Sequence, residues 1–475
     1  MPTSSPDRLT LHILNRLSYG PKPGDVDHIQ AISIDAYIDG QLTPQALAIP
    51  KDLSQRIAQL PDFQASPDSL RQKYARNPDR AANVMEGKQK QAQPQVLDST
   101  IAARIWRATE SPQQLQEVMT EFWFNHFNVF GHKGKVQLYL ADYELNAIQP
   151  RTLGDFRTLL GAIAKHPAML IYLDNTGNRV IKNRKNEKGV NENYARELLE
   201  LHTLGVDGGY SQGDIIALAR ILTGWVDLPA TKAGVTQPDP SGAYFRQDWH
   251  DFSDKQLLGH TIKGQGKAEL DQALDVIARH PSTARHLSYK LAQWFVQDNP
   301  PPDLVQQLQQ TFLASNGNIT AVLKTLFNSP HFRDPNTFSV KFKTPYQYVV
   351  SVIRAGDLTV IDPPKINGWL RQLSMPLYDC LTPNGYDNTA QIWLNPDGLL
   401  RRLTLIESLP RQIATPDRPQ RPLRYPASQM TTLTKDALQN TLGEMFTPQT
   451  QRVVAANPGD RQPSLLLGSP EFMYR

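Results

Sequence analysis

Apolar residues recur every three or four positions along most of the chain, the spacing that places them on one face of an α-helix. The pattern predicts helices over residues 9–17, 26–37, 97–108, 115–130, 152–164, 192–204, 212–222, 270–278, 283–296, 303–314, 319–327, 345–354 and 399–409. We therefore expect a mainly α fold, a multi-helix globular array in two or more packed lobes with long loops and one short β-hairpin.

The segments between these helices indicate where the chain divides. Residues 231–266 are rich in Gly, Pro, Asp and aromatic residues, which predicts a long loop with a hairpin around residues 244–249. Residues 174–189 predict a basic loop. The expected units are an N-terminal helical lobe over 1–230, the long loop over 231–266, a second helical lobe over 267–410, a proline- and arginine-rich linker over 411–428, and C-terminal helices over 429–475.

Length and charge narrow the classes of protein. A chain of 475 residues exceeds what one hydrophobic core supports, which agrees with several lobes. The net charge of +4 is mild and forms no basic stripe, so no nucleic-acid partner is expected. No apolar run approaches the roughly 18 residues of a transmembrane segment, and the start shows no signal-peptide pattern. These features predict a soluble, cytoplasmic protein, the alternative being export with a partner. The single cysteine, Cys380, is expected to be a small packing residue.

The helix expected near residues 191–205 carries the densest set of polar residues. On a helical wheel, Asn193, Arg196, Glu197 and Glu200 share an arc about 100° wide, while leucines cover most of the remainder. Arg196 and Glu200 are spaced to pair with each other, which leaves Glu197 without an obvious local partner. Glu197 is therefore a candidate metal ligand or general acid/base; the alternative is a structural ion-pair network.

His202 belongs to the same predicted helix but lies roughly 140° from Glu197 around its axis. The two side chains therefore share a site only if the helix breaks between them. The alternatives for His202 are a core histidine with satisfied hydrogen bonds and a functional residue.

A second helix, near residues 121–130, combines aromatic and polar residues. Glu121, Asn125 and Asn128 share one face, His126 lies beside them, and aromatic residues occupy much of the remainder. This face is either the polar edge of a core helix or one wall of a cleft opposite the Glu197 arc.

His250 and Asp251 stand next to each other in the expected long loop. A His-Asp pair can bind a metal, although helical phosphohydrolases place theirs on a helix. The alternative is a hydrogen bond that holds the loop. The chain has no His-Glu-x-x-His zinc motif, no phosphate-binding Gly-x-x-x-x-Gly-Lys-Ser/Thr loop and no Gly-x-Ser-x-Gly elbow, so no standard motif predicts a cofactor.

Several segments together resemble the DUF1800 family. The most distinctive is residues 191–209, NENYARELLELHTLGVDGG. The others, in the same order as in the family, are LNRLSYG at 14–20, FWFNHF at 122–127, HPAMLIYLDN at 166–175, LTGW at 222–225, His250-Asp251, KTP at 343–345, PNG at 383–385 and SPEF at 469–472. The resemblance covers about 95% of the chain, so the lobes form one family-length unit.

The resemblance implies a largely helical protein without an established activity. Members of the family resemble exported proteins encoded beside DUF1501 proteins, which implies a DUF1501-type protein as partner. This chain departs from the family in lacking an export signal, and in carrying Tyr386 where relatives have Trp, which is expected to alter one pocket wall.

Two functional hypotheses follow. The first is an enzyme with a buried polar site for hydrolysis or group transfer, assisted by a divalent metal. Its candidate catalytic residues are Glu197, His250, Asp251 and His126. Its candidate metal ligands are Glu197, Asn193, His250 and Asp251. The other polar residues of its cleft are Glu121, Asn125, Arg196, Glu200 and His202. The second is a non-catalytic assembly or export partner of a DUF1501-type protein.

Overall fold

The computed structural model describes residues 8–74, 95–180, 190–228, 237–358, 362–414 and 433–475. Within these residues regular structure is almost entirely helical, and the strands form two sheets of two strands each. The predicted mainly α, multi-helix fold is therefore confirmed. None of the helices in the described ranges combines the length and apolar character needed to cross a bilayer.

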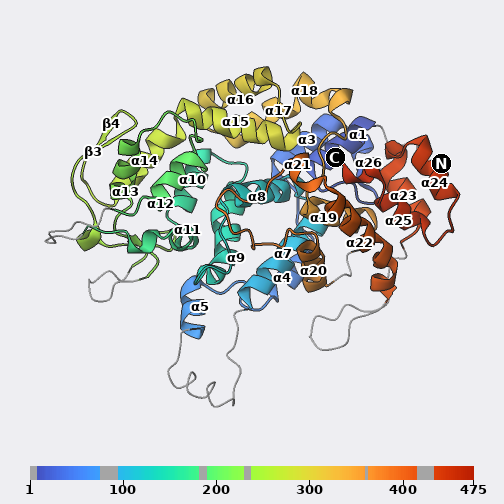
Figure 1. Cartoon of the computed structure of the whole chain (residues 1–475), viewed down its shortest axis with the longest axis horizontal. Helices are drawn as coiled ribbons and strands as arrows, with labels where there is room; N and C mark the ends of the chain where they lie inside the picture. Colours follow the sequence, from blue (N-terminus) through green and yellow to red (C-terminus); the bar gives the residue numbers. More distant parts are fainter. Residues whose placement is uncertain (1–7, 75–94, 181–189, 229–236, 359–361, 415–432) are drawn as a thin grey trace, which may run out of the picture.

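Two helices lie at the centre of the molecule, α7 (Val96–Glu110) and α8 (Gln114–His126) (Figure 1). Both are buried on nearly all sides, because α7 packs against α4, α8, α9, α19 and α20. The helices before them are α1 (Arg8–Leu17), α2 (Asp25–Ile32), α3 (Ile34–Leu42), η1 (Pro44–Ala46), α4 (Lys51–Ala58) and α5 (Pro67–Lys73). Polar residues of α7 and α8 consequently lie inside the protein and need partners there.

One end of the molecule is formed by the helices that follow α8 and by the two small sheets (Figure 1). The helical elements are η2 (Val136–Leu138), α9 (Leu140–Asp142), the π-helix η3 (Tyr143–Ile148), η4 (Gln149–Arg151), α10 (Phe156–Ala164), α11 (Pro167–Tyr172), η5 (Asn175–Gly177), α12 (Asn193–Glu200), α13 (Gln212–Ile221), η7 (Gln247–Trp249) and α14 (Ala268–Ala278). The strands are β1 (Trp225–Val226), β2 (Tyr244–Phe245), β3 (Lys255–Leu257) and β4 (His260–Ile262).

The β-hairpin does not lie where the sequence predicted. Strand β2 pairs antiparallel with the distant β1, with Trp225 opposite Phe245. The hairpin is β3–β4, joined at Leu258 and Gly259, which both have positive φ. A two-residue turn of this kind needs left-handed backbone, which Gly259 favours. The prediction instead placed the hairpin at the aromatic-rich residues 244–249. Strand pairing thus orders part of the long loop, at β2 and in the β3–β4 hairpin.

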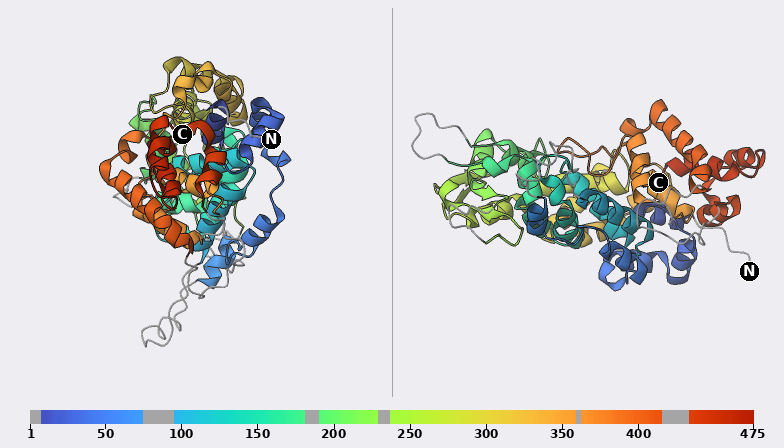
Figure 2. Two further views of the ribbon diagram at one scale, coloured as in Figure 1. Left: turned by 90° about the vertical axis from the view of Figure 1, so that its right-hand side faces the viewer. Right: turned by 90° about the horizontal axis from the view of Figure 1, so that it is seen from below.

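The remaining helices run across the top of Figure 1 and form its other end. They are α15 (Pro281–Phe295), α16 (Pro302–Ala314), α17 (Ile319–Phe327), α18 (Pro330–Arg333), η8 (Pro335–Thr337), α19 (Pro345–Ala355), α20 (Pro363–Gln372), α21 (Ala390–Trp393), α22 (Pro396–Ala414), α23 (Lys435–Leu442), η10 (Gly443–Met445), α24 (Pro448–Ala455), α25 (Gln462–Leu467) and α26 (Pro470–Met473). Figure 2 shows the β3–β4 lobe and the C-terminal helices at opposite ends of an elongated molecule.

Two predicted boundaries in this comparison differ from the structure. The helix expected over 26–37 breaks at Ser33, whose φ of 82° is incompatible with a helix and whose hydroxyl caps α3. The linker expected over 411–428 begins inside α22, and residues 415–428 lie outside the described residues, as do residues 181–189 of the basic loop. The division into lobes stays a prediction.

Candidate functional site

A small cavity lies between α7, α8, α19 and residues 375–386, the segment that follows α20. Its volume is about 30 Å³, enough for a water-sized molecule. It is lined by Arg104, Glu121, Phe124, Asn125, Asn128, Tyr346, Met375, Leu377, Tyr378 and Tyr386. We call it the Glu121 cavity, because Glu121 is the acidic residue among these.

Arg104, which lines the cavity, and Arg107, which follows it on α7, both form ion pairs with buried glutamates. Arg104 Nη1 lies 3.0 Å from Glu144 Oε2, and Arg107 Nε lies 3.2 Å from Glu117 Oε2. Arg107 also pairs with the second oxygen of Glu144. These pairs link α7 to α8 and to the π-helix η3, and all four groups are buried. Two arginines are thus paired with two glutamates, and among the described residues no cation lies within salt-bridge distance of Glu121, on which Arg104 and Arg475 act from further away.

Glu121 is buried, with 3% of its surface exposed. Within the described ranges, neither of its carboxylate oxygens accepts a hydrogen bond of good geometry. Burial raises the pKa of Glu121 to about 7, although the positive charges of Arg104 and Arg475 and the nearby donor groups of Tyr19 and Gln347 lower it in part. Glu121 therefore exchanges its proton close to neutral pH.

Asn125, one turn further along α8, and Asn128, just after the end of α8, hold the outer wall of the cavity. Asn125 Nδ2 donates to the Tyr386 carbonyl at 2.7 Å, and the Tyr386 amide donates to Asn125 Oδ1 at 2.8 Å. Asn128 Nδ2 donates to the carbonyls of Cys380 and Thr382 at 3.0 and 2.8 Å. The shared face that the sequence predicted thus binds the 375–386 segment and leaves the Glu121 carboxylate behind it.

Glu197 occupies a more open position on α12. It is half-buried, and burial together with the charge of Glu200 raises its pKa. Arg196 lies 3.2 Å from Glu192 and 3.5 Å from Glu200, so the predicted ion pair forms at the surface of the helix. Asn193 is exposed and donates to the Leu173 carbonyl. This arc consequently faces solvent and not a dry interior.

The α12 helix ends at Glu200, earlier than the sequence predicted, because the Thr203 hydroxyl and the Gly205 amide donate to the carbonyls of Leu198 and Leu199. His202 therefore lies in the following turn and is fully buried. It packs beside His126, with ring centroids 6.1 Å apart. His126 is also buried, and its Nε2 bonds to the His202 carbonyl at 3.0 Å.

His250 and Asp251 belong to a different network. His250 Nε2 lies 2.9 Å from Glu269 Oε1 and its Nδ1 lies 2.8 Å from the Thr223 carbonyl. Lys255 Nζ lies 2.5 Å from Glu269 Oε2, and the side chains of His250, Glu269 and Lys255 are all buried. Asp251 accepts from Ser253 and pairs weakly with Arg220. The contacts favour the loop-fixing interpretation of His250.

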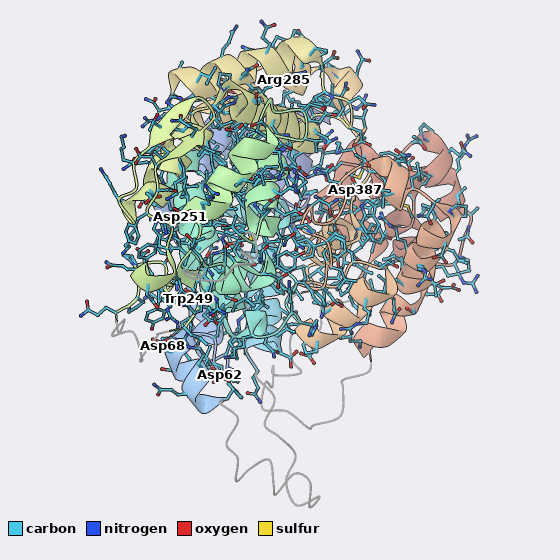
Figure 3. The ribbon with its side chains drawn as sticks, turned by 60° about the vertical axis from the view of Figure 1, so that its left-hand side comes forward. Asp62, Asp68, Trp249, Asp251, Arg285 and Asp387 are labelled. Carbon is cyan, nitrogen blue, oxygen red and sulfur yellow. The ribbon has the colours of Figure 1, made fainter. Side chains whose placement is uncertain are left out.

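Figure 3 separates this network from the Glu121 cavity, because Asp251 and Asp387, the residue after Tyr386, lie in clearly different parts of the view. Both nitrogens of His250 already have protein partners. Among the described residues, no group of three or more His, Cys, Asp or Glu is arranged to hold a metal ion. The metal set Glu197, Asn193, His250 and Asp251 stays a prediction, and this geometry does not gather its members.

The family model described as a protein of unknown function, DUF1800, matches residues 12–474 of this chain. The chain belongs to the DUF1800 family. Comparison with curated proteins and with solved structures finds no match. Three segments of the DUF1800 resemblance meet at the Glu121 cavity: residues 122–127 contribute Asn125, residues 343–345 directly precede Tyr346, and residues 383–385 directly precede Tyr386.

Sequence reasoning missed several residues around this DUF1800 cavity. Arg104, Arg107, Glu117 and Glu144 form its ionic floor, and Tyr378 donates to Glu144 at 2.7 Å. A usable signal existed for the arginines, since both stand beside the apolar residues of the IAARIWRA run, in a helix most of whose residues are buried. Their partners were beyond prediction because they come from residues 10 to 40 positions away.

Proposed function

We propose that this protein is a hydrolase in which Glu121 moves the proton during attack of a water molecule. The observation that carries the proposal is that Glu121, a buried acid whose carboxylate oxygens accept no hydrogen bond within the described residues, lines a cavity of about 30 Å³. A general base works best when its pKa lies near the operating pH, and burial raises the pKa of Glu121 to about 7.

The walls of the cavity suit this chemistry. The cavity has room for a water-sized molecule beside the Glu121 carboxylate. Arg104 also lines it, and its ion pair with Glu144 fixes the guanidinium in the cavity wall. The cavity is too small for a whole substrate, so the substrate binds outside it, against residues 375–386. Glu197 lies near this segment, since its charge acts on the Tyr172 hydroxyl, which donates to the Leu381 carbonyl at 2.8 Å.

The test is a screen for hydrolysis of carboxylic ester, amide, phosphoester and glycoside bonds, with the wild type, Glu121→Gln and, as a matched surface control, Glu192→Gln. We expect turnover of one class with a pH–rate inflection near 7, and a loss of about 100-fold or more in Glu121→Gln. Parallel assays with a chelator and with added divalent cations test the metal-assisted version. Turnover retained in Glu121→Gln, or absent for all four classes, would reject the proposal.

A second candidate is a non-catalytic assembly or export partner of a DUF1501-type protein. Exposed apolar side chains on and beside α21 and α22 favour it, with Ile392 47%, Leu394 43% and Leu400 64% exposed. Co-expression of the two chains tests it: we expect co-purification that Leu400→Asp abolishes, and that Val206→Asp, at a residue 69% exposed elsewhere, leaves intact. Independent elution of the two wild-type chains would exclude this role.

A further inference from the structure

A lysine and three histidines gather on the side of α8 that faces α15. Lys290 and His286 stand one turn apart on α15, His126 ends α8, and His202 lies in the turn after α12. The ring centroid of His126 lies 6.1 Å from that of His202 and 6.2 Å from that of His286. Lys290 Nζ lies 3.1 Å from His126 Nδ1. None of these groups lines the Glu121 cavity.

The hydrogen bonds define the state of His126. Its Nε2 faces the His202 carbonyl, which only accepts, so Nε2 carries the proton. Its Nδ1 therefore has a free lone pair, and this pair accepts from the Lys290 ammonium. Burial and the charge of Lys290 hold the pKa of His126 well below its usual range, which keeps the ring neutral. The Nδ1 atom of His126 is consequently a hydrogen-bond acceptor in contact with an amine.

No described carboxylate forms an ion pair with Lys290, and Asp387 is the acid whose charge acts on it from a distance. Burial lowers the pKa of Lys290 to about 8, so a fraction of the amine is neutral at physiological pH. Part of the Lys290 surface nevertheless remains exposed. Lys343 provides the contrast: burial lowers its pKa to about 7, but it is 2% exposed and its ammonium lies over the Phe472 ring.

A nucleophile in hydrogen-bond contact with a base, which a third group orients, is the arrangement used for covalent catalysis. Lys290, His126 and the His202 carbonyl satisfy it. We propose that Lys290 is the nucleophile of a second site, which binds an aldehyde or ketone as a covalent imine with His126 as proton carrier. The site rests on its own contacts and does not depend on the hydrolase proposal.

The step balances without an oxidant or reductant. The neutral Lys290 amine attacks the carbonyl carbon, the C–N bond forms, and the carbonyl π electrons move to oxygen. His126 Nδ1 takes a proton from nitrogen and delivers it to oxygen, which yields a carbinolamine. A second proton follows the same route, the C–O bond breaks, and oxygen departs as water. Both protons of the amine thus end on the released water, and the product is an imine.

The test uses the full chain, propanal as the carbonyl probe and cyanoborohydride to trap the imine as a stable secondary amine, followed by peptide mass mapping. We expect Lys290 to be labelled about tenfold faster than the exposed Lys324 at pH 7.5 and Lys343 to stay unlabelled. The labelling rate should reach half its maximum near pH 8, and Lys290→Arg should remove the adduct.

His126→Phe tests the base: we expect slower labelling of Lys290 in a chain whose far-ultraviolet circular dichroism is unchanged. If that variant does not fold, the pH dependence of Lys290 labelling in the wild type tests the proposal by itself. Labelling of Lys290 no faster than that of Lys324, or a rate that still rises steeply above pH 9, would overturn the proposal. Glu121→Gln separates the two proposals, because it should abolish hydrolysis and leave Lys290 labelling intact.

Discussion

Glu121 shows how a single residue acquires unusual chemistry from its neighbours. It is one of several buried acids on or near α8, but Glu117 and Glu144 each contact an arginine. Burial therefore costs Glu121 more than it costs the others, because no ion pair offsets the desolvation of its charge. The same feature that makes it a candidate proton carrier also makes the folded protein sensitive to pH.

We expect this sensitivity to appear in unfolding experiments on Glu121→Gln. The pKa of Glu121 is raised from 4.5 to about 7 in the folded chain, so folded protein holds the proton more tightly than unfolded protein does. The contribution of Glu121 to the free energy of unfolding is thus largest below pH 4.5 and falls by about 3 kcal/mol as the pH rises towards 7. Urea unfolding should show Glu121→Gln gaining stability over the wild type at pH 8 but not at pH 4.5.

The comparison of the two proteins at each pH isolates Glu121 from the buried histidines, which titrate in both. An equal difference at pH 4.5 and pH 8 would mean that Glu121 carries no raised pKa, and the hydrolase proposal would lose its basis.

The network of His250, Glu269 and Lys255 gives a second expectation at this scale. Glu269→Gln removes the carboxylate that faces two buried side chains, at 2.9 Å from His250 and 2.5 Å from Lys255. Breaking a buried pair from one side costs about 3–5 kcal/mol, which urea unfolding at pH 7 should detect. The matched control is Asp254→Asn in the exposed Lys263–Asp254 pair of the same hairpin, which should leave stability unchanged. Equal effects would show that the network is not structural.

At the scale of elements, the Glu121 cavity exists because the 375–386 segment lies directly against α8. Gly385 has a φ of +75°, and a Cβ at this position would overlap the carbonyl and the side chain of Asn125. The Asn125–Tyr386 hydrogen bonds hold the same contact from both sides. The PNG segment at 383–385 can therefore lie this close to α8 because residue 385 is glycine.

Gly385→Ala should push this wall away from α8. We expect a loss of about 1–3 kcal/mol in stability from the overlap and entry of water, which returns the pKa of Glu121 towards its ordinary value. The pH dependence described for Glu121→Gln would then weaken, which urea unfolding across pH 4.5–8 measures. Gly368→Ala in α20 is the control, since nothing lies within 4 Å of a Cβ there; it should be neutral or stabilising.

At the scale of the whole molecule, residues 472–475 connect the C-terminal helices to earlier parts of the chain. Tyr474 forms a β-bridge with Phe342, and the buried Arg475 donates to the Trp294 carbonyl at 2.9 Å. Phe472 is buried at 1% exposure against Tyr348. These contacts join the C-terminal helices to α15 and α19, and α1 also packs against η10.

Phe472→Ala should therefore destabilise other parts of the molecule as well as the C-terminal helices. We expect a loss of about 3–5 kcal/mol in the free energy of unfolding, with reduced hydrogen-exchange protection in α15 and α1 as well as in α23–α26. Val453→Ala, at a residue 48% exposed on α24, should change neither. Loss of protection confined to α23–α26 would show that these helices form an independent unit.

The sequence by itself determined the helical class, the family and most helix positions, because apolar periodicity is a local property that burial then enforces. The helix expected over 319–327 coincides with α17, whereas the helix carrying Glu121 and Asn125 ends before Asn128, although all three line the same cavity. Periodicity does not state which face of α12 meets solvent, and the structure shows that Asn193 is exposed and that Glu197 is half-buried.

Only the tertiary structure decided that Glu121 forms no salt bridge within the described residues and that Lys290 contacts the neutral His126. Glu144 pairs with arginines 37 and 40 residues away, and Lys290 reaches His126 across 164 residues. The pKa of a buried group depends on such neighbours and on the loss of water around it, and neither is encoded in the spacing of residues along the chain.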